Sequence, residues 1–471
     1  GRDPLLTFDE WRAYGEFERG TGYMFLSWNT RPIQNELHIH GTRGVIHVDC
    51  FLQTCQVSRV YPGPKQIGMV IAGTINALKK SWAVPRNMLR FITGSLKPSP
   101  GIYRCVQDFH RALHEGREVP VSAKEGRDAI ARIEGACLLA DAEKTRLLDA
   151  QYTQPLESAR VLVTGGAGFL GSALVARLRE NGESVRLLVR RPRGKQDGCS
   201  EVLGSLGQPE IVDHAMKGVE VVYHVGAAMK GGAAEFEQGT IWGTRNVVAS
   251  CLKHGVKRLV YVSSLSVADH ASHRTGDPVT ESAPLEPFPK NRGAYTQTKM
   301  EAERMVLDAA RDRGLQVVVI RPGQIFGPGS ENVTPNGVIG IAGKWIVAGS
   351  GSRKLPLVYL DDVVDGLLAA STSDAALGQV VNLVDSTPID QNEYLNRAKR
   401  KASRVPVWFL MCAAYGIELL GKVLKRGVPL SRYKIRSLKP LYPFDCSRAK
   451  SLLGWTPRVG TREGLRRTFG G

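Results

Sequence analysis

A tyrosine and a lysine one helical turn apart carry the chemistry that this sequence indicates most clearly. Tyr295 and Lys299 are separated by three residues, so a helix places both side chains on one face. A phenol with a pKa of about 10 is a poor acid or base at neutral pH, and a neighbouring ammonium lowers that pKa by favouring the phenolate. The pair therefore predicts an acid/base, Tyr295, whose pKa is adjusted by Lys299.

A glycine-rich turn between an apolar strand and a helix supplies the second indication. Residues 161–171 read V-L-V-T-G-G-A-G-F-L-G, and a helix is predicted over Ser172–Asn181. Glycines let the backbone approach a pyrophosphate, and the free amides at the helix start hold its negative charge. We therefore expect a dinucleotide, NADP or NAD, at this turn. Its predicted contacts there are Gly165, Gly168, Phe169, Leu170 and Gly171.

A parallel sheet is needed to position these residues, and the chain beyond residue 158 has the pattern for one. The predicted strands are 160–164, 184–189, 219–225, 258–263 and 316–321, and the predicted helices are 172–181, 236–254 and 293–313. Alternation of this kind builds a doubly wound, Rossmann-like α/β sheet covered on both faces. Ser264 follows the fourth predicted strand, at the edge where open sheets carry their sites.

The order of motifs in this region resembles the extended short-chain dehydrogenase/reductase family. The motifs are T-G-G-A-G-F-L-G, Y-H-V-G-A-A, G-T-R-N-V-V, Y-V-S-S, Y-T-Q-T-K, R-P-G-Q-I-F-G-P-G and L-G-W-T-P-R, and they span nearly all of residues 158–471. The resemblance implies a Rossmann-like domain with a small C-terminal substrate subdomain. The substrate and lid parts are expected at about 325–345 and 386–471.

The resemblance also implies roles for individual residues. Ser264 hydrogen-bonds the substrate oxygen and helps to polarise its carbonyl, with Ser263 and Ser266 as alternatives. Lys299 also holds the nicotinamide ribose, so the predicted catalytic residues are Ser264, Tyr295 and Lys299. The further predicted cofactor contacts are Arg190, Arg191, Ser205, Leu206, Ala227, Tyr295, Lys299 and Pro322.

The end of the second predicted strand bears on the choice of cofactor. NAD is normally held there by an acidic residue, whereas residues 190–195 read R-R-P-R-G-K. Guanidinium groups suit a 2′-phosphate, which favours NADP, and a basic surface loop is the alternative. Two family contacts are altered. Ser205 replaces the aspartate expected near the adenine, and Thr240 replaces the asparagine that precedes G-T.

Residues 1–150 resemble the C-terminal half of the glucose–fructose oxidoreductase/inositol dehydrogenase (Gfo/Idh/MocA) family. The resembling stretches are L-H-I-H-G-T-R-G-V-I-H-V-D (37–49) and V-P-V-S-A-K-E-G-R-D-A-I-A-R-I-E (119–134). The resemblance implies an incomplete α+β domain, joined by a linker at 151–157 to the domain at 158–471. In that family this half serves subunit pairing, so we expect a homo-oligomer. The chain lacks an initial methionine and is interpreted as a fusion protein shortened at its front.

The first domain is predicted to hold a mainly antiparallel sheet followed by helices. Alternating apolar and polar residues indicate strands within Gly20–Phe51. Helices are expected over about Ile102–His114 and Ser122–Leu148, the second opening with a capping box. Residues 62–100 are expected to be irregular apart from an amphipathic piece near 67–82.

Composition limits the other functions open to this chain. The net charge is +18, but no aromatic-interleaved basic motif or zinc finger accompanies it, so we expect a small-molecule substrate and no nucleic acid. Scattered cysteines without a C-x-x-C pair favour a cytoplasmic protein. His38, His40 and His47 alternate on predicted strands without an evident carboxylate or cysteine pattern, so no metal is predicted.

The tail leaves two interpretations open. Residues 405–417 are apolar and basic residues follow, so 405–436 could lie on a membrane surface or form a buried lid helix. Such tails resemble the 3β-hydroxysteroid dehydrogenase branch, which favours hydride transfer to or from a steroid- or lipid-like secondary alcohol or ketone. The alternatives are a sugar-nucleotide epimerase/dehydratase and a non-catalytic dinucleotide-binding scaffold or sensor.

Overall fold

The chain forms two compact units, Gly1–Ala150 and Gln151–Gly471. The computed structural model describes residues 10–27, 34–59, 61, 64–96, 100–153, 156–191, 198–229, 231–269, 278–335, 337–341, 344–423, 432–436 and 443–470.

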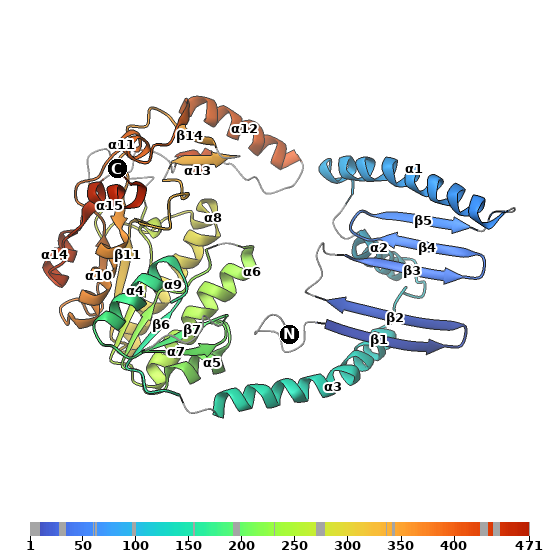
Figure 1. The fold of residues 1–471 in the computed structure, drawn as a ribbon, viewed down its shortest axis with the longest axis horizontal. Helices are drawn as coiled ribbons and strands as arrows, with labels where there is room; N and C mark the ends of the chain where they lie inside the picture. The colour runs from blue at the N-terminus through green and yellow to red at the C-terminus, as the bar shows by residue number, and fades with distance from the viewer. Residues whose placement is uncertain are drawn as a thin grey trace. The chain divides into compact units, whose positions relative to one another are not determined.

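The second unit is built on a sheet of seven parallel strands (Figure 1). In spatial order they are β16 (Val380–Leu383), β11 (Val317–Pro322), β10 (Arg258–Val262), β9 (Val221–His224), β6 (Val161–Thr164), β7 (Val185–Val189) and β8 (Cys199–Leu203). The strand order reverses between β6 and β9, and such a reversal opens a crevice at the carboxyl ends of the two strands. The predicted doubly wound sheet is confirmed, and β8 and β16 extend it beyond the predicted strands.

Helices cover both faces of this sheet, each with its own apolar core (Figure 1). One layer contains α4 (Phe169–Glu180) and α10 (Leu360–Thr372), and the other contains α5 (Pro209–Met216), α7 (Gly243–Lys253) and α9 (Ala294–Arg313). Leu174 and Leu367 are fully buried in the first layer, and Val247 and Val306 in the second. This coverage explains why the strands are apolar on both sides.

Short irregular helices adjoin the carboxyl edge of the sheet. The predicted helix over 236–254 is divided into α6 (Ala233–Phe236), a π-helical turn (Glu237–Trp242) and α7. A 3₁₀ turn (Leu265–Val267) follows β10, and α8 (Pro289–Arg292) precedes α9. Single π-helical turns inside α-helices are frequent near functional sites.

The chain beyond β11 adds a smaller cluster of elements to the sheet. They are β12 (Gln324–Phe326), β13 (Val338–Ile341), β14 (Lys344–Ala348), β15 (Leu357–Tyr359), β17 (Ala402–Val405), α11 (Gln391–Arg397), α12 (Val407–Val423), α13 (Arg432–Arg436), α14 (Ser447–Leu453) and α15 (Gly460–Phe469). The buried carboxylate of Asp362 accepts hydrogen bonds from the amides of Arg458, Val459 and Gly460 at 2.8–2.9 Å. These bonds tie the C-terminal segment to α10.

The apolar tail segment forms α12, which continues beyond the predicted residues. Trp408 and Phe409 are 68% and 54% exposed, whereas Ala414 is fully buried. Among the described residues, no helix combines the length and apolar character needed to cross a membrane.

The first unit contains antiparallel strands and three helices (Figure 1). The strands are β1 (Glu10–Phe17), β2 (Gly20–Ser27), β3 (Glu36–Gly41), β4 (Gly44–Asp49) and β5 (Thr54–Arg59), and the helices are α1 (Lys65–Ile92), α2 (Pro100–His114) and α3 (Ala123–Thr153). The strands form a hairpin, β1–β2, and a three-stranded sheet, β3–β4–β5. The antiparallel prediction is therefore confirmed.

The helices of this unit differ in part from the prediction. Residues 62–100 are not mostly irregular, because α1 runs through Pro85. Tertiary contacts hold α1 in place. The Asn76 side-chain Nδ2 donates to Ser58 Oγ at 2.8 Å, and the Asn87 side-chain Nδ2 donates to the Gln53 carbonyl at 2.8 Å. The capping box is confirmed, since the Glu125 amide donates to Ser122 Oγ at 3.2 Å. The helix α3 extends through residues 151–153 of the predicted linker.

Candidate functional site

The glycine turn after β6 is shaped by close backbone contacts that exclude side chains. Gly165 has φ +73°, and a Cβ atom there would lie 2.6 Å from Gly226 Cα. A Cβ on Gly171 would lie 2.1 Å from the Gly165 carbonyl oxygen. Larger residues at these two positions would force the turn apart.

The helix α4 begins at this turn with its first amides uncapped by any side chain. Its N-cap residue is Gly168, and the partly exposed Phe169 and buried Leu170 open its first turn. An uncapped helix start with a close backbone approach is a favourable binding place for a pyrophosphate. The residues predicted for the dinucleotide thus lie together and fit that group.

A buried histidine braces the turn, and sequence reasoning gave it no role. His224 Nδ1 is 2.7 Å from Thr164 Oγ1, and its Nε2 is 3.0 Å from Thr244 Oγ1. Burial lowers the pKa of His224 to about 3, so the ring is neutral at physiological pH. The Gly226 amide donates to the same Thr164 hydroxyl at 3.2 Å. The side chains of β6, β9 and α7 therefore fix the loops on both sides of the crevice.

Tyr295 and Ser264 meet at the carboxyl edge of the sheet. Tyr295 is in the first turn of α9, and Ser264 follows β10. Burial raises the pKa of Tyr295, and the interaction with the Ser264 side chain acts in the opposite direction. The expected lowering of this pKa is therefore wrong for this arrangement, because desolvation outweighs the favourable interactions. Tyr295 is accordingly protonated at neutral pH, as a proton donor must be.

Lys299 lies one turn below Tyr295 and is buried. Its Nζ donates to the Val262 carbonyl at 2.7 Å and lies 5.2 Å from the centre of the Tyr261 ring. Burial lowers the pKa of Lys299 to about 8, while Glu303 acts to raise it. A lysine ammonium has three donors, so the bond to β10 leaves capacity for a further acceptor.

A buried ion pair lies under Lys299 and distinguishes the neighbouring serines. Glu303 pairs with Arg321 of β11, and both side chains are almost fully buried. Ser263 Oγ donates to Glu303 Oε2 at 2.5 Å, so this hydroxyl points into the network. Ser264 Oγ instead accepts the Ser266 amide at 3.2 Å, and Ser264 lowers the pKa of Tyr295 against the effect of burial. Of the three candidate serines, Ser264 is therefore the one that interacts with Tyr295.

The loop after β8 is held by side chains rather than by a regular element. The Ser205 amide donates to Gln208 Oε1 at 2.8 Å, and Ser205 Oγ accepts the Gly207 amide at 3.3 Å. The Asn246 side chain donates to the Leu206 carbonyl at 2.8 Å. Asn246 therefore positions this predicted adenine contact from α7.

The remaining predicted residues surround the same crevice. Thr240 is buried in the π-helical turn and accepts the Ala228 amide at 3.1 Å, so it holds the loop after β9. Ala227 is half-buried in that loop, and Pro322 is buried at the end of β11. Arg190 and Arg191 are exposed directly after β7, while residues 192–195 of the predicted basic loop lie outside the described residues.

This arrangement brings a glycine turn shaped to receive an anion and the phenol of Tyr295 to the carboxyl edge of the sheet. The strand order brings the glycine turn, Ser264 and the start of α9 to the carboxyl ends of neighbouring strands. Such a site can bind a dinucleotide and deliver a proton to an oxygen near Tyr295. Sequence reasoning missed His224, Glu303 and Arg321; a histidine and an arginine within otherwise apolar strands were the available signals.

The sequence of the second unit is similar to those of known proteins. Residues 161–383 match the sequence model of the NAD dependent epimerase/dehydratase family. The 2-alkyl-3-oxoalkanoate reductase of Stenotrophomonas maltophilia (strain K279a) is 34% identical over 328 residues, covering 65% of this chain and 98% of that protein. The 3beta-hydroxysteroid-dehydrogenase/decarboxylase isoform 1 of Arabidopsis thaliana is 32% identical over 347 residues, covering 65% of this chain and 78% of that protein.

Solved structures share the fold. The crystal structure of gox2253 has 26% sequence identity and a TM-score of 0.57, covering 66% of this chain and 97% of that one. The structure of MoeE5 in complex with UDP-glucose and NAD has 25% identity and a TM-score of 0.51, with coverage of 66% and 97%.

Replacement of Gly171 by alanine tests the glycine turn. The new Cβ would meet the Gly165 carbonyl oxygen at 2.1 Å, so the turn must open. We expect Gly171→Ala to weaken dinucleotide binding at least about tenfold and to cost about 1–3 kcal/mol of unfolding free energy. Titration of intrinsic fluorescence and denaturant unfolding measure the two effects.

Gly416→Ala is the matched control, because a Cβ at Gly416 in α12 meets nothing within 4 Å. Equal dinucleotide affinity in the Gly171 and Gly416 variants would contradict the proposed geometry of the turn.

Proposed function

Because the chain belongs to the NAD dependent epimerase/dehydratase family, we propose that Ser264, Tyr295 and Lys299 carry the chemistry of its second unit. The protein is an NAD(P)-dependent oxidoreductase that transfers hydride between nicotinamide and a secondary alcohol or ketone. The observation that carries the residue assignment is the placement of Ser264, directly after β10, and Tyr295, in the first turn of α9, close enough for Ser264 to affect the pKa of Tyr295.

The three residues divide the work in carbonyl reduction. The bound nicotinamide supplies the hydride. Ser264 donates a hydrogen bond to the carbonyl oxygen and orients it toward Tyr295. Tyr295 then gives its proton to that oxygen, and its raised pKa keeps the proton available at neutral pH. Lys299 lies one helical turn from Tyr295, so its ammonium stabilises the phenolate that forms. The hydrogen bond from Lys299 Nζ to the Val262 carbonyl fixes the position of that ammonium.

NADP is the proposed form of the cofactor. Arg190 and Arg191 are exposed at the end of β7, where the family's NAD-binding members place an acidic residue. Two guanidinium groups at this place suit a 2′-phosphate and leave ribose hydroxyls without a carboxylate partner.

The proposed substrate is a ketone attached to a long apolar group. The 34% identical relative is a 2-alkyl-3-oxoalkanoate reductase, and the 32% identical relative is a hydroxysteroid dehydrogenase/decarboxylase. Both names describe an oxo or hydroxy group on an apolar skeleton. An epimerase acting on a sugar nucleotide is the second candidate, since MoeE5 binds UDP-glucose and NAD and shares the fold.

Turnover by a Tyr295→Phe variant tests the assignment. The variant keeps the ring and loses the acid, so we expect kcat to fall about 100- to 10,000-fold with dinucleotide binding largely unchanged. The assay follows NADPH or NADH oxidation with a 2-alkyl-3-oxo acid and, separately, with a 3-oxosteroid. Tyr394→Phe is the control, since Tyr394 is buried in α11 and takes no part in the site.

The outcomes separate the candidates. Full activity of Tyr295→Phe would overturn the residue assignment. Interconversion of UDP-sugars without net cofactor oxidation would support the epimerase, and tight dinucleotide binding without any turnover would support a scaffold. Faster turnover with NADH than with NADPH would contradict the proposed cofactor.

We propose that the first unit is a Gfo/Idh/MocA-like domain that pairs with a second copy. On its three-stranded sheet, Leu37, Ile39 and Val57 are 52%, 48% and 44% exposed and lie on one face by the strand register. Sedimentation velocity should give a dimer, and Ile39→Asp with Val57→Asp should shift it to monomer. A monomeric parent protein would contradict this proposal.

We also propose a peripheral membrane contact through residues 405–436 of a cytoplasmic protein. The exposed rings of Trp408, Phe409 and Tyr415 on α12 support it, although residues 424–431 lie outside the described residues. In a flotation assay with anionic vesicles, the parent protein should rise with the vesicles, whereas a variant with Trp408→Ser and Phe409→Ser should stay in the lower fractions. Equal flotation of both would favour a lid helix.

A further inference from the structure

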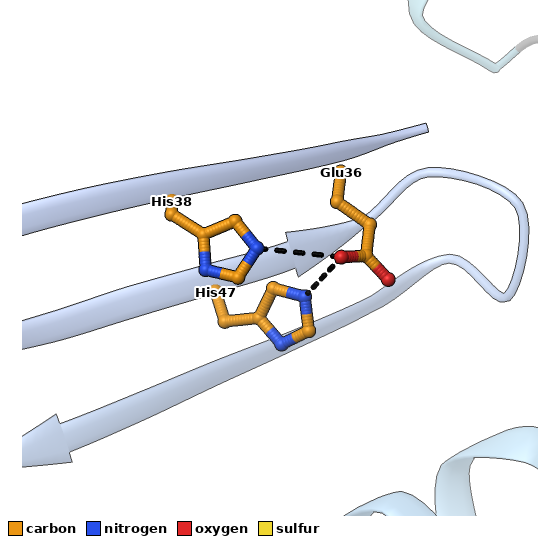
Figure 2. Close-up of side chains that lie close together, drawn as sticks. All are labelled: Glu36, His38 and His47. Atoms are coloured by element: carbon orange, nitrogen blue, oxygen red, sulfur yellow. Dashed lines mark hydrogen bonds and ion pairs between the residues drawn. The ribbon is translucent and has the colours of Figure 1, made fainter. Parts of the chain in front are cut away.

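We propose that Glu36, His38 and His47 of the first unit bind one divalent transition-metal ion, with Zn²⁺ as the first candidate. The three side chains converge on one face of the β3–β4–β5 sheet (Figure 2). Each offers one ligand atom, and these atoms all lie within 4.8 Å of one another. The proposal concerns a site separate from the dinucleotide crevice and does not depend on the proposed reaction.

Strand geometry brings the three residues together. Side chains two positions apart in a strand point to the same face, so Glu36 and His38 share one face of β3. His47 of β4 lies directly opposite His38 in the antiparallel register. The opposite face of the sheet carries apolar residues instead, such as Ile39 of β3 and Ile46 of β4. The cluster is therefore fixed by the pairing of two strands rather than by a loop.

The separations of the two histidine nitrogens from the Glu36 oxygen match those required by a small cation, and the two nitrogens lie within 4.8 Å of each other. His38 Nε2 lies 3.3 Å from Glu36 Oε2, and His47 Nε2 lies 3.4 Å from the same oxygen. In a tetrahedral zinc site with bonds of about 2.0–2.2 Å, neighbouring ligand atoms lie about 3.3–3.6 Å apart. Small side-chain adjustments would thus place one ion between the three atoms.

The orientation of the two imidazole rings also suits a shared cation. The rings are stacked with their centres 4.3 Å apart, so both present Nε2 toward the same carboxylate oxygen. The buried Nε2 atom of His47 faces Glu36 Oε2 at 3.4 Å and, among the described residues, makes no hydrogen bond of good geometry (Figure 2). A metal bound by two neutral imidazoles and one carboxylate satisfies this nitrogen and neutralises the carboxylate.

The ligand set leaves a coordination position open. Two histidines and one glutamate occupy three corners of a tetrahedron, the ligand number of zinc sites that keep a fourth position for water or a ligand. The side chains of His38 and Glu36 are 50% and 31% exposed, so an exchangeable fourth ligand can reach the ion. Asp49 is not counted as a ligand, because its Oδ1 accepts the amides of Phe51 and Leu52 at 3.0 and 2.8 Å.

Metal titration of the full chain tests the site. Protein freed of metal with a chelator is titrated with Zn²⁺ at neutral pH by competition against a chromophoric chelator, and with Co²⁺ by visible absorption. We expect one saturable site per chain and a Co²⁺ spectrum of nitrogen and oxygen ligands, without intense thiolate charge-transfer bands. His38→Gln and His47→Gln should each weaken Zn²⁺ binding by at least about 100-fold.

His40→Gln is the matched control, because His40 lies on the same face two residues beyond His38 and outside the three-ligand cluster. It should bind Zn²⁺ as tightly as the parent protein. Glu36→Gln gives a second test with little change of shape, and far-UV circular dichroism checks the fold of every variant. Absence of a saturable site, equal loss in His40→Gln and His38→Gln, or a thiolate Co²⁺ spectrum would overturn the proposal.

Discussion

The contact between the backbones that follow β6 and β9 is the constraint on which the dinucleotide site depends. Gly165 and Gly226 approach so closely that a larger residue at Gly165 would place its Cβ 2.6 Å from Gly226 Cα. The hydrogen bonds of His224 to Thr164 and Thr244 hold the two strand ends and α7 in place around that contact. The uncapped start of α4 and the residues at the end of β10 are then brought to the same edge of the sheet.

Much of the second unit could be predicted from its sequence, because its strands are continuous apolar runs and its motifs are local. The glycine turn, the Tyr295–Lys299 spacing and the parallel sheet needed no long-range information. The pKa of Tyr295 could not be predicted, since it depends on desolvation by segments distant in sequence. The choice of Ser264 over Ser263 likewise depended on a buried network with Glu303, which only the packing of α9 against the sheet reveals.

The first unit was harder to predict because tertiary contacts overrule local signals there. Pro85 marks a break in the sequence, yet α1 passes through it and is held by contacts with the sheet. The histidines on β3 and β4 lacked an evident carboxylate partner in the sequence. Glu36 and His38 share a face of β3, and the antiparallel register adds His47 of β4 opposite His38, which brings all three side chains together.

The helix α9 carries Tyr295, Lys299 and Glu303 on three successive turns of one face, each fixed to a different part of the sheet region. Each residue of an α-helix rotates the next by about 100° around the helix axis. A single insertion or deletion between these positions would therefore turn the side chains beyond it away from the shared face. Length changes are therefore expected to be excluded from this segment over evolutionary time.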